Sequence, residues 1–131
     1  MLRGLHFQSG AFAQAKLVRV LQGEVLDVAV DLRPNSHTFG QYYSIVLNHQ
    51  NKKQLFIPRG FAHGFIVLSE TAVFAYKVDN HYSKAHEGGI LYNDPQLAID
   101  WHLPTHEIVL SEKDALLPSF EEWKDQSDTH H

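Results

Sequence analysis

Three side chains that can transfer protons or carry positive charge lie on strand faces that are otherwise apolar. In "IPRGFAHGF" (57–65), His63 follows a Pro-Gly turn and shares a face with two phenylalanines. Lys16 shares a face with two valines in "KLVRV", and Tyr76 shares one with a phenylalanine and a valine in "AVFAYKV". Each alone also fits a structural role: a buried histidine bonded to backbone, a solvated lysine, or a core tyrosine with its hydroxyl at the rim. Together they predict a lined pocket capable of acid–base chemistry.

Short strands separated by turn residues must position these side chains. The stretches richest in β-branched and aromatic residues are 16–22, 24–33, 41–48, 54–57, 64–69 and 72–79, with weaker candidates at 2–7, 88–93 and 107–111. Only "LPSFEEWKDQ" near the C-terminus is typical of a helix. This spacing predicts an all-β fold, a sandwich or closed barrel, in which alternate residues of each strand face the interior.

Composition predicts one globular domain and excludes several classes of protein. The 131 residues suit a single core, with a barrel and active site over about 1–118 and a polar tail over 119–131 that ends in His130 and His131 and is assigned no function. A net charge of -4 argues against nucleic-acid binding, and the absence of cysteine excludes disulfides. "MLRGLHFQSG" lacks the apolar core of a signal peptide and no apolar run reaches membrane length, so we expect a cytoplasmic protein with no membrane partner.

Motifs in a fixed order resemble one known family. They are "RGLHFQ", "AKLVRV", "DVAVDLR", "TFG", "IPRGFAHGF", "YK" and "SEKD", from Leu2 to about Pro118. In order and spacing they resemble the dTDP-4-dehydrorhamnose 3,5-epimerase family of nucleotide-sugar epimerases. The resemblance implies a cupin-type jelly-roll β-barrel, usually a homodimer, with neither a metal nor an organic cofactor. The implied reaction inverts C3 and C5 of dTDP-4-dehydro-6-deoxy-D-glucose, giving dTDP-4-dehydro-L-rhamnose.

Epimerisation next to a ketone requires three kinds of group. The C4 ketone acidifies the protons on C3 and C5, so a base, a proton donor on the opposite face of the sugar and a cation at the C4 oxygen are needed. By the resemblance, His6 is the base and Asp114 is the carboxylate that fixes its tautomer. Tyr76 is the proton donor, and Lys16 stabilises the enolate. His63 then lies beside the sugar as a substrate-binding residue, with its phenylalanine neighbours as an apolar wall.

Other positions match substrate contacts of the family. Arg3 has the guanidinium geometry suited to a diphosphate. Tyr82 matches the aromatic residue that stacks on thymine, and Glu87 and Lys113 match further substrate contacts. Simple alternation puts Arg3 and His6 on opposite faces of a strand, whereas a bulge at the intervening glycine would bring both to the pocket.

Two features of the chain have no direct part in the expected chemistry. Asp31 and Arg33 of "DVAVDLR" are assigned to structure. The family's strands before "LRGLH", which exchange between subunits and supply nucleotide contacts, do not precede Met1; a miscalled start, a fragment or a short relative would each account for this. A barrel without those strands would expose a sheet edge or apolar surface, which predicts a homo-oligomer, most simply an isologous homodimer.

Three alternative functions remain open. "PRGFAHGF" fits the second metal motif of cupin oxygenases and isomerases, but "GLHFQSG" supplies one histidine where the first motif needs two, so no metal site is expected. A cupin ketoisomerase acting on a similar substrate could use the same base and donor. A truncated, non-catalytic cupin that binds a sugar nucleotide is the alternative from outside the enzymes.

Overall fold

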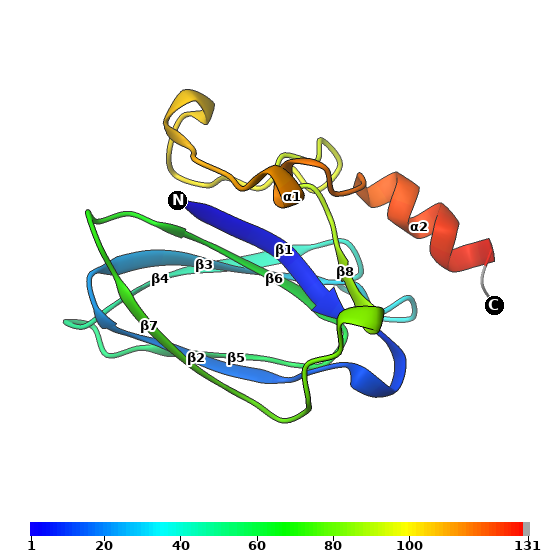
Figure 1. Ribbon diagram of the computed structural model, residues 1–131, viewed down its shortest axis with the longest axis horizontal. Helices are drawn as coiled ribbons and strands as arrows, with labels where there is room; N and C mark the ends of the chain where they lie inside the picture. The colour runs from blue at the N-terminus through cyan, green and yellow to red at the C-terminus, as the bar shows by residue number, and fades with distance from the viewer. Residues whose placement is uncertain (130–131) are drawn as a thin grey trace.

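Two antiparallel sheets face each other in this computed structural model, which describes residues 1–129 (Figure 1). The larger sheet has the order β4 (Tyr42–Asn48), β3 (Glu24–Asp31), β6 (Phe61–Val67), β1 (Leu2–Gln8), β8 (Glu87–Gly89). The smaller sheet has the order β5 (Gln54–Ile57), β2 (Lys16–Gln22), β7 (Val73–Val78). The predicted all-β, jelly-roll fold is confirmed. His130 and His131 lie outside the described residues.

Most strands lie where the sequence predicts them. The structure has β2 and β5 at the predicted residues, and β6 begins at Phe61 rather than 64 because Phe61 already pairs with Asp31 of β3. Of the three weaker candidates, 2–7 is confirmed as β1, but the other two are not full strands. Of 88–93 only the first residues form β8, and 107–111 makes a single bridge, Leu2 to Leu110, so its assignment as a strand is wrong.

Short helical elements follow the strands. One-turn 3-10 helices occupy Gly10–Phe12, Lys84–His86 and Thr105–Glu107, and the α-helices are α1 (Glu112–Ala115) and α2 (Phe120–Thr129). A capping box starts α2: the Glu122 amide donates to the Ser119 hydroxyl and the Ser119 amide donates to the Glu122 carboxylate, both at 3.1 Å. Within residues 1–129, no helix combines the length and apolar character needed to cross a bilayer.

Two apolar cores lie on opposite sides of the larger sheet. The inter-sheet core, between the two sheets, is built on Val18, Val20, Val25, Ala29, Leu47 and Ile57. The outer core, between the larger sheet and the C-terminal segment that covers it in Figure 1, includes Leu5, Leu26, Val28, Ile66, Trp101 and Phe120. Because both faces of β3 are covered, every residue from Val25 to Asp31 is buried, which explains its nearly continuous apolar sequence.

Candidate functional site

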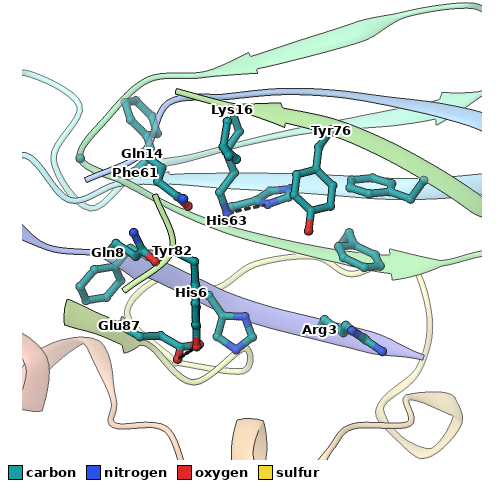
Figure 2. Close-up of a pocket in the computed structure, with 15 residues that line it drawn as sticks. Arg3, His6, Gln8, Gln14, Lys16, Phe61, His63, Tyr76, Tyr82 and Glu87 are labelled. Carbon is teal, nitrogen blue, oxygen red and sulfur yellow. Dashed lines mark hydrogen bonds between the residues drawn. The ribbon is translucent and has the colours of Figure 1, made fainter. Parts of the chain in front are cut away.

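A cavity of about 600 Å³ opens between the two sheets (Figure 2). Seven of the nine predicted site residues line it: Arg3, His6, Lys16, His63, Tyr76, Tyr82 and Glu87. The other two, Asp114 and Lys113, contact members of this set from outside the lining. The structure therefore gathers residues from β1, β2, β6, β7, β8 and the preceding loop into one place.

Strand alternation explains how three of these side chains reach the cavity. Phe61, His63 and Phe65 of β6 all line it. In the smaller sheet, Tyr76 pairs with Val18 and Lys16 pairs with Val78 across the β2–β7 ladder, so these residues share one face. His63 is 8% exposed, whereas Tyr76 is 61% exposed. The histidine thus lies deep in the pocket and the tyrosine near its mouth.

His6 of β1 pairs with a buried carboxylate. Its Nε2 is 2.5 Å from Oδ1 of Asp114, which is 3% exposed and also accepts the Gly4 amide at 3.2 Å. The Ser111 hydroxyl caps α1 by accepting the amide of Asp114, and the two bonds from the Asp114 carboxylate link this one-turn helix to β1. Because the carboxylate occupies Nε2, the lone pair of an otherwise unpartnered Nδ1 is available as a base within the part of the chain described.

An irregularity in β1 brings Arg3 and His6 to the same cavity. The register between β1 and β6 shifts between these two residues, as expected for a bulge at Gly4. Gly4 has φ of 124°, and a Cβ there would lie 2.6 Å from the Cα of Gly64. A side chain at Gly4 is therefore excluded by both its backbone conformation and the close approach of β6.

A second carboxylate, not singled out from the sequence, lies behind His63. Asp27 of β3 is fully buried, and its Oδ1 is 2.6 Å from His63 Nε2. His63 Nδ1 is 3.5 Å from Lys16 Nζ. Because an ammonium group only donates, His63 accepts from Lys16 at Nδ1 and donates to Asp27 from Nε2. An acid inside a strand buried on both faces needs such a partner, and that was the signal available in the sequence.

The environment of Lys16 makes its ammonium group more acidic. Burial lowers the pKa of Lys16, and the negative charge of Asp27 opposes this effect. The ammonium is therefore a better hydrogen-bond and proton donor than an exposed lysine. Such a group suits a position where negative charge develops on an oxygen.

The mouth of the cavity carries a second polar cluster. The Tyr82 hydroxyl donates to Glu87 Oε2 at 2.8 Å, and Lys113 Nζ lies 3.4 Å from each carboxylate oxygen of Glu87. The hydrogen bond from Tyr82 is the main cause that lowers the pKa of Glu87, and the same bond raises the pKa of Tyr82. Glu87 is thus held as a carboxylate beside an exposed aromatic ring.

Two glutamines also line the cavity, and the sequence did not predict them as site residues. Gln8 and Gln14 both face the cavity, and their amides bond to backbone groups of the neighbouring loops. Only "RGLHFQ" as a motif drew attention to Gln8. Alternation within one strand gives no information on which distant loop a polar side chain meets.

The described residues offer no obvious metal centre. Within 1–129, no group of three or more His, Cys, Asp and Glu side chains could hold a metal ion. His6 engages Asp114, and both ring nitrogens of His63 have partners. The cavity is instead lined by His6 on one sheet and by Tyr76 and Lys16 on the other.

Comparison with known proteins agrees with this geometry. The profile of the dTDP-4-dehydrorhamnose 3,5-epimerase family matches residues 1–122. The dTDP-4-dehydrorhamnose 3,5-epimerase of Escherichia coli K12 is 52% identical over 122 residues, which are 93% of this chain and 65% of that protein. The chain thus spans just under two thirds of the length of this curated relative.

Solved structures of similar proteins share the fold. The dTDP-4-dehydrorhamnose 3,5-epimerase of Elizabethkingia anophelis NUHP1 is 59% identical with a TM-score of 0.91, covering 92% of this chain and 66% of that one. A dTDP-6-deoxy-D-glucose-3,5-epimerase from Legionella pneumophila Philadelphia 1, solved in complex with dTDP-4-keto-L-rhamnose, is 54% identical with a TM-score of 0.87, covering 92% of this chain and 63% of that one.

Proposed function

Because the chain belongs to the dTDP-4-dehydrorhamnose 3,5-epimerase family, we propose that its cavity is the active site of a nucleotide-sugar epimerase. The substrate is dTDP-4-dehydro-6-deoxy-D-glucose, inverted at C3 and C5 to give dTDP-4-dehydro-L-rhamnose. The observation that carries the proposal is that His6, paired with Asp114, and Tyr76 lie on opposite sheets and line the same cavity. Inversion requires a base and a donor on opposite sides of the carbon.

His6 is the base in this mechanism. Its Nδ1 takes the proton from a carbon next to the C4 ketone, and the charge that the ring then acquires is stabilised by Asp114 at 2.5 Å from Nε2. The carboxylate also keeps the proton on Nε2, so that Nδ1 faces the reaction as an acceptor. Asp114 therefore acts through His6 rather than on the sugar.

Tyr76 and Lys16 act from the smaller sheet. Tyr76 returns a proton to the opposite face of the carbon, and Lys16 donates to the C4 oxygen as the enolate forms. The His63–Asp27 pair orients Lys16, because Nδ1 of His63 accepts from its ammonium. These six side chains supply the base, the donor, the enolate stabiliser and their positioning partners, so no step in this proposal calls for a metal or an organic cofactor.

The nucleotide occupies the mouth of the cavity. Arg3 binds the diphosphate, and the exposed ring of Tyr82 stacks on thymine. Glu87 and Lys113 contribute further polar contacts to the substrate. A nucleotide diphosphate sugar carries charges that a bilayer excludes, so we expect this enzyme in the cytoplasm, where such substrates are made.

Deuterium exchange tests the proposal directly. In D2O the chain should introduce deuterium at C3 or C5 of dTDP-4-dehydro-6-deoxy-D-glucose. Mass spectrometry measures the deuterium incorporated, and NMR shows at which carbon it lies. His6→Asn should reduce that exchange by about 10²–10⁴, the usual effect of losing a general base. Tyr76→Phe should retain part of the exchange while the inverted product falls, because the base is intact. Asp114→Asn should lie between wild type and His6→Asn.

The control is His49→Asn, which removes an exposed histidine in the turn after β4. It should exchange at the wild-type rate. If wild type and His6→Asn bind the substrate and exchange at the same background rate, the chain is a non-catalytic binding protein. If exchange persists in His6→Asn but is lost in His63→Asn, the base is His63.

A homodimer accompanies this function. The outward face of the smaller sheet exposes several large apolar side chains, among them Phe56 at 62%, Leu21 at 51% and Val73 at 47%. Large apolar side chains exposed together on one sheet face are usually covered by a partner. Light scattering at micromolar concentration should give the mass of a dimer, and a compact, stable monomer would contradict it.

A further inference from the structure

One buried amide joins the two loops at the mouth of the cavity. Gln8, the last residue of β1, is 9% exposed. Its Nε2 donates to the carbonyl of Phe12 at 2.7 Å and to the carbonyl of His81 at 3.0 Å. Its Oε1 accepts the amide of Ser83 at 2.8 Å. Both ends of the side-chain amide are therefore engaged with backbone.

The bonds on the second loop surround a single residue. His81 and Ser83 are the immediate chain neighbours of Tyr82, so Gln8 holds the backbone on both sides of that tyrosine. Figure 2 shows Gln8 and Tyr82 beside each other at the mouth of the cavity. The ring of Tyr82 is 66% exposed, and its hydroxyl is fixed by Glu87 at 2.8 Å. Gln8 thus constrains the main chain from which this exposed ring projects.

Other bonds between the same loops make the connection continuous. Gln14 Nε2 donates to the carbonyl of Asn80 at 2.9 Å, and Asn80 Nδ2 donates to the carbonyl of Ala11 at 2.9 Å. The amide of Ala15 donates to Asp79 Oδ1 at 2.8 Å. These bonds lie on the earlier part of the second loop, before His81. Gln8 alone among these side chains reaches past Tyr82 to Ser83.

We propose that Gln8 is a positioning residue that holds the Tyr82 ring as a platform for the planar base of the nucleotide. The inference rests on the proposed function for the identity of that nucleotide. A flat ring binds another ring well only when it is already oriented, because ordering a mobile loop on binding reduces affinity. Loss of the amide would also leave two carbonyls and one N–H without this partner.

The test is the affinity of Gln8→Met for dTDP, measured by isothermal titration calorimetry. Methionine retains the length of the side chain and removes both donors and the acceptor. We expect the Kd for dTDP to rise about 10-fold. At saturating substrate, the exchange kcat should change by less than about 3-fold, because the base and donor lie on other side chains. The matched control is Gln54→Met, which changes an exposed glutamine of β5. It should bind dTDP as wild type does.

Hydrogen exchange of the backbone distinguishes positioning from general destabilisation. In Gln8→Met the amides of 80–86, including that of Ser83, should exchange faster while those of β3 remain as protected as in wild type. Equal loss of protection in both segments, or a dTDP affinity equal to that of wild type, would overturn the proposal.

A second variant keeps the proposal testable if Gln8→Met does not fold. Gln8→Glu retains the acceptor for Ser83, but its carboxylate faces the carbonyls of Phe12 and His81. Protonation restores one donor, and the two facing carbonyls favour the protonated form, so its dTDP affinity relative to wild type should rise as the pH is lowered from 7 toward 4. A constant ratio would contradict the role of Gln8. If wild type binds no dTDP at all, the proposed function fails, while the loop exchange still decides whether Gln8 orders Tyr82.

Discussion

One face of strand β6 contacts a filled apolar core, and the other face contacts an open cavity with buried polar groups. Ala62, Gly64 and Ile66 face the outer core, which is apolar and closely filled. A Cβ on Gly64 would lie only 2.9 Å from the Arg3 carbonyl oxygen. His63 on the opposite face lines the cavity and bonds to a buried carboxylate. Seven residues of one strand thus contribute to both packing and the proposed chemistry.

This difference indicates where stability and activity should reside. On the outer face, removing volume leaves a void that neighbouring side chains cannot fill. On the cavity face, space is already open, and the costly feature is the burial of charged and polar groups. Substitutions on the outer face should therefore lower stability with little loss of activity, whereas substitutions on the cavity face should do the reverse.

Among variants that compare the two sides, the largest effect is expected from Lys16 on the cavity side. Lys16→Met should lower deuterium exchange by about 10²–10³, because the developing charge on the C4 oxygen loses its donor. The melting temperature should not fall. Burial lowers the pKa of Lys16, which means that its charge is unfavourable there. Deuterium exchange measures the activity of Lys16→Met, and circular dichroism measures its melting temperature. A large loss of stability with normal exchange would show that Lys16 stabilises the fold and is not needed for activity.

The outer face should give the opposite result. Ile66 is 1% exposed, so Ile66→Ala should lower the free energy of unfolding by about 2–5 kcal/mol. Exchange per folded molecule should stay within about 3-fold of wild type. Urea unfolding provides the stability, and Val109→Ala, at a residue that is 59% exposed, is the control. A variant of normal stability but impaired exchange would show that the two faces are coupled.

A smaller effect with a pH signature is expected at Asp31. Burial would raise the pKa of Asp31, but hydrogen bonds from Arg33, Ser36 and Thr38 outweigh it and hold the pKa well below its usual range. Asp31→Asn should therefore cost about 2–3 kcal/mol at pH 7. Because the folded-state pKa is depressed, this stabilisation is complete above about pH 4 and is lost as pH falls below it.

Melting at a series of pH values tests whether the ionised carboxylate of Asp31 stabilises the fold. Thermal melts of wild type and Asp31→Asn should differ most near pH 7 and converge in acid. Asp125→Asn, in the exposed part of α2, should melt like wild type throughout. A difference that grows as the pH falls would mean that the carboxylate of Asp31 does not stabilise the fold. The Arg33 guanidinium lies 4.8 Å from the ring centroid of Phe61, which lines the cavity, so we expect a minor change in substrate affinity in Asp31→Asn.

No effect at all is expected from metal removal. His63 has a partner at each ring nitrogen, and among residues 1–129 no three His, Cys, Asp or Glu side chains are grouped so that they could hold a metal ion. Dialysis against a chelator should leave exchange unchanged, and elemental analysis should find no stoichiometric transition metal. One iron, manganese or zinc per chain, with activity lost on chelation, would favour a metal-dependent cupin instead.

The sequence by itself determined the strands and the direction of their side chains. The period-2 alternation in "KLVRV" and "AVFAYKV" depends only on neighbouring residues, so β2, β7 and the cavity-facing Lys16 and Tyr76 could be predicted. The order of the motifs likewise identified the family. The predicted roles of the individual site residues rest on that resemblance and await the experiments above.

Only the tertiary structure decided which groups meet. Asp27 lies in a strand that is apolar on both faces, so no periodicity marks it, and its partner His63 is 36 residues away. Gln8 reaches His81 across 73 residues, and His6 reaches Asp114 across 108. The segment 107–111 has the composition of a strand, but it forms only one bridge among the described residues, between Leu110 and Leu2. Local sequence sets where a side chain points, whereas the packing of distant elements sets what it finds there.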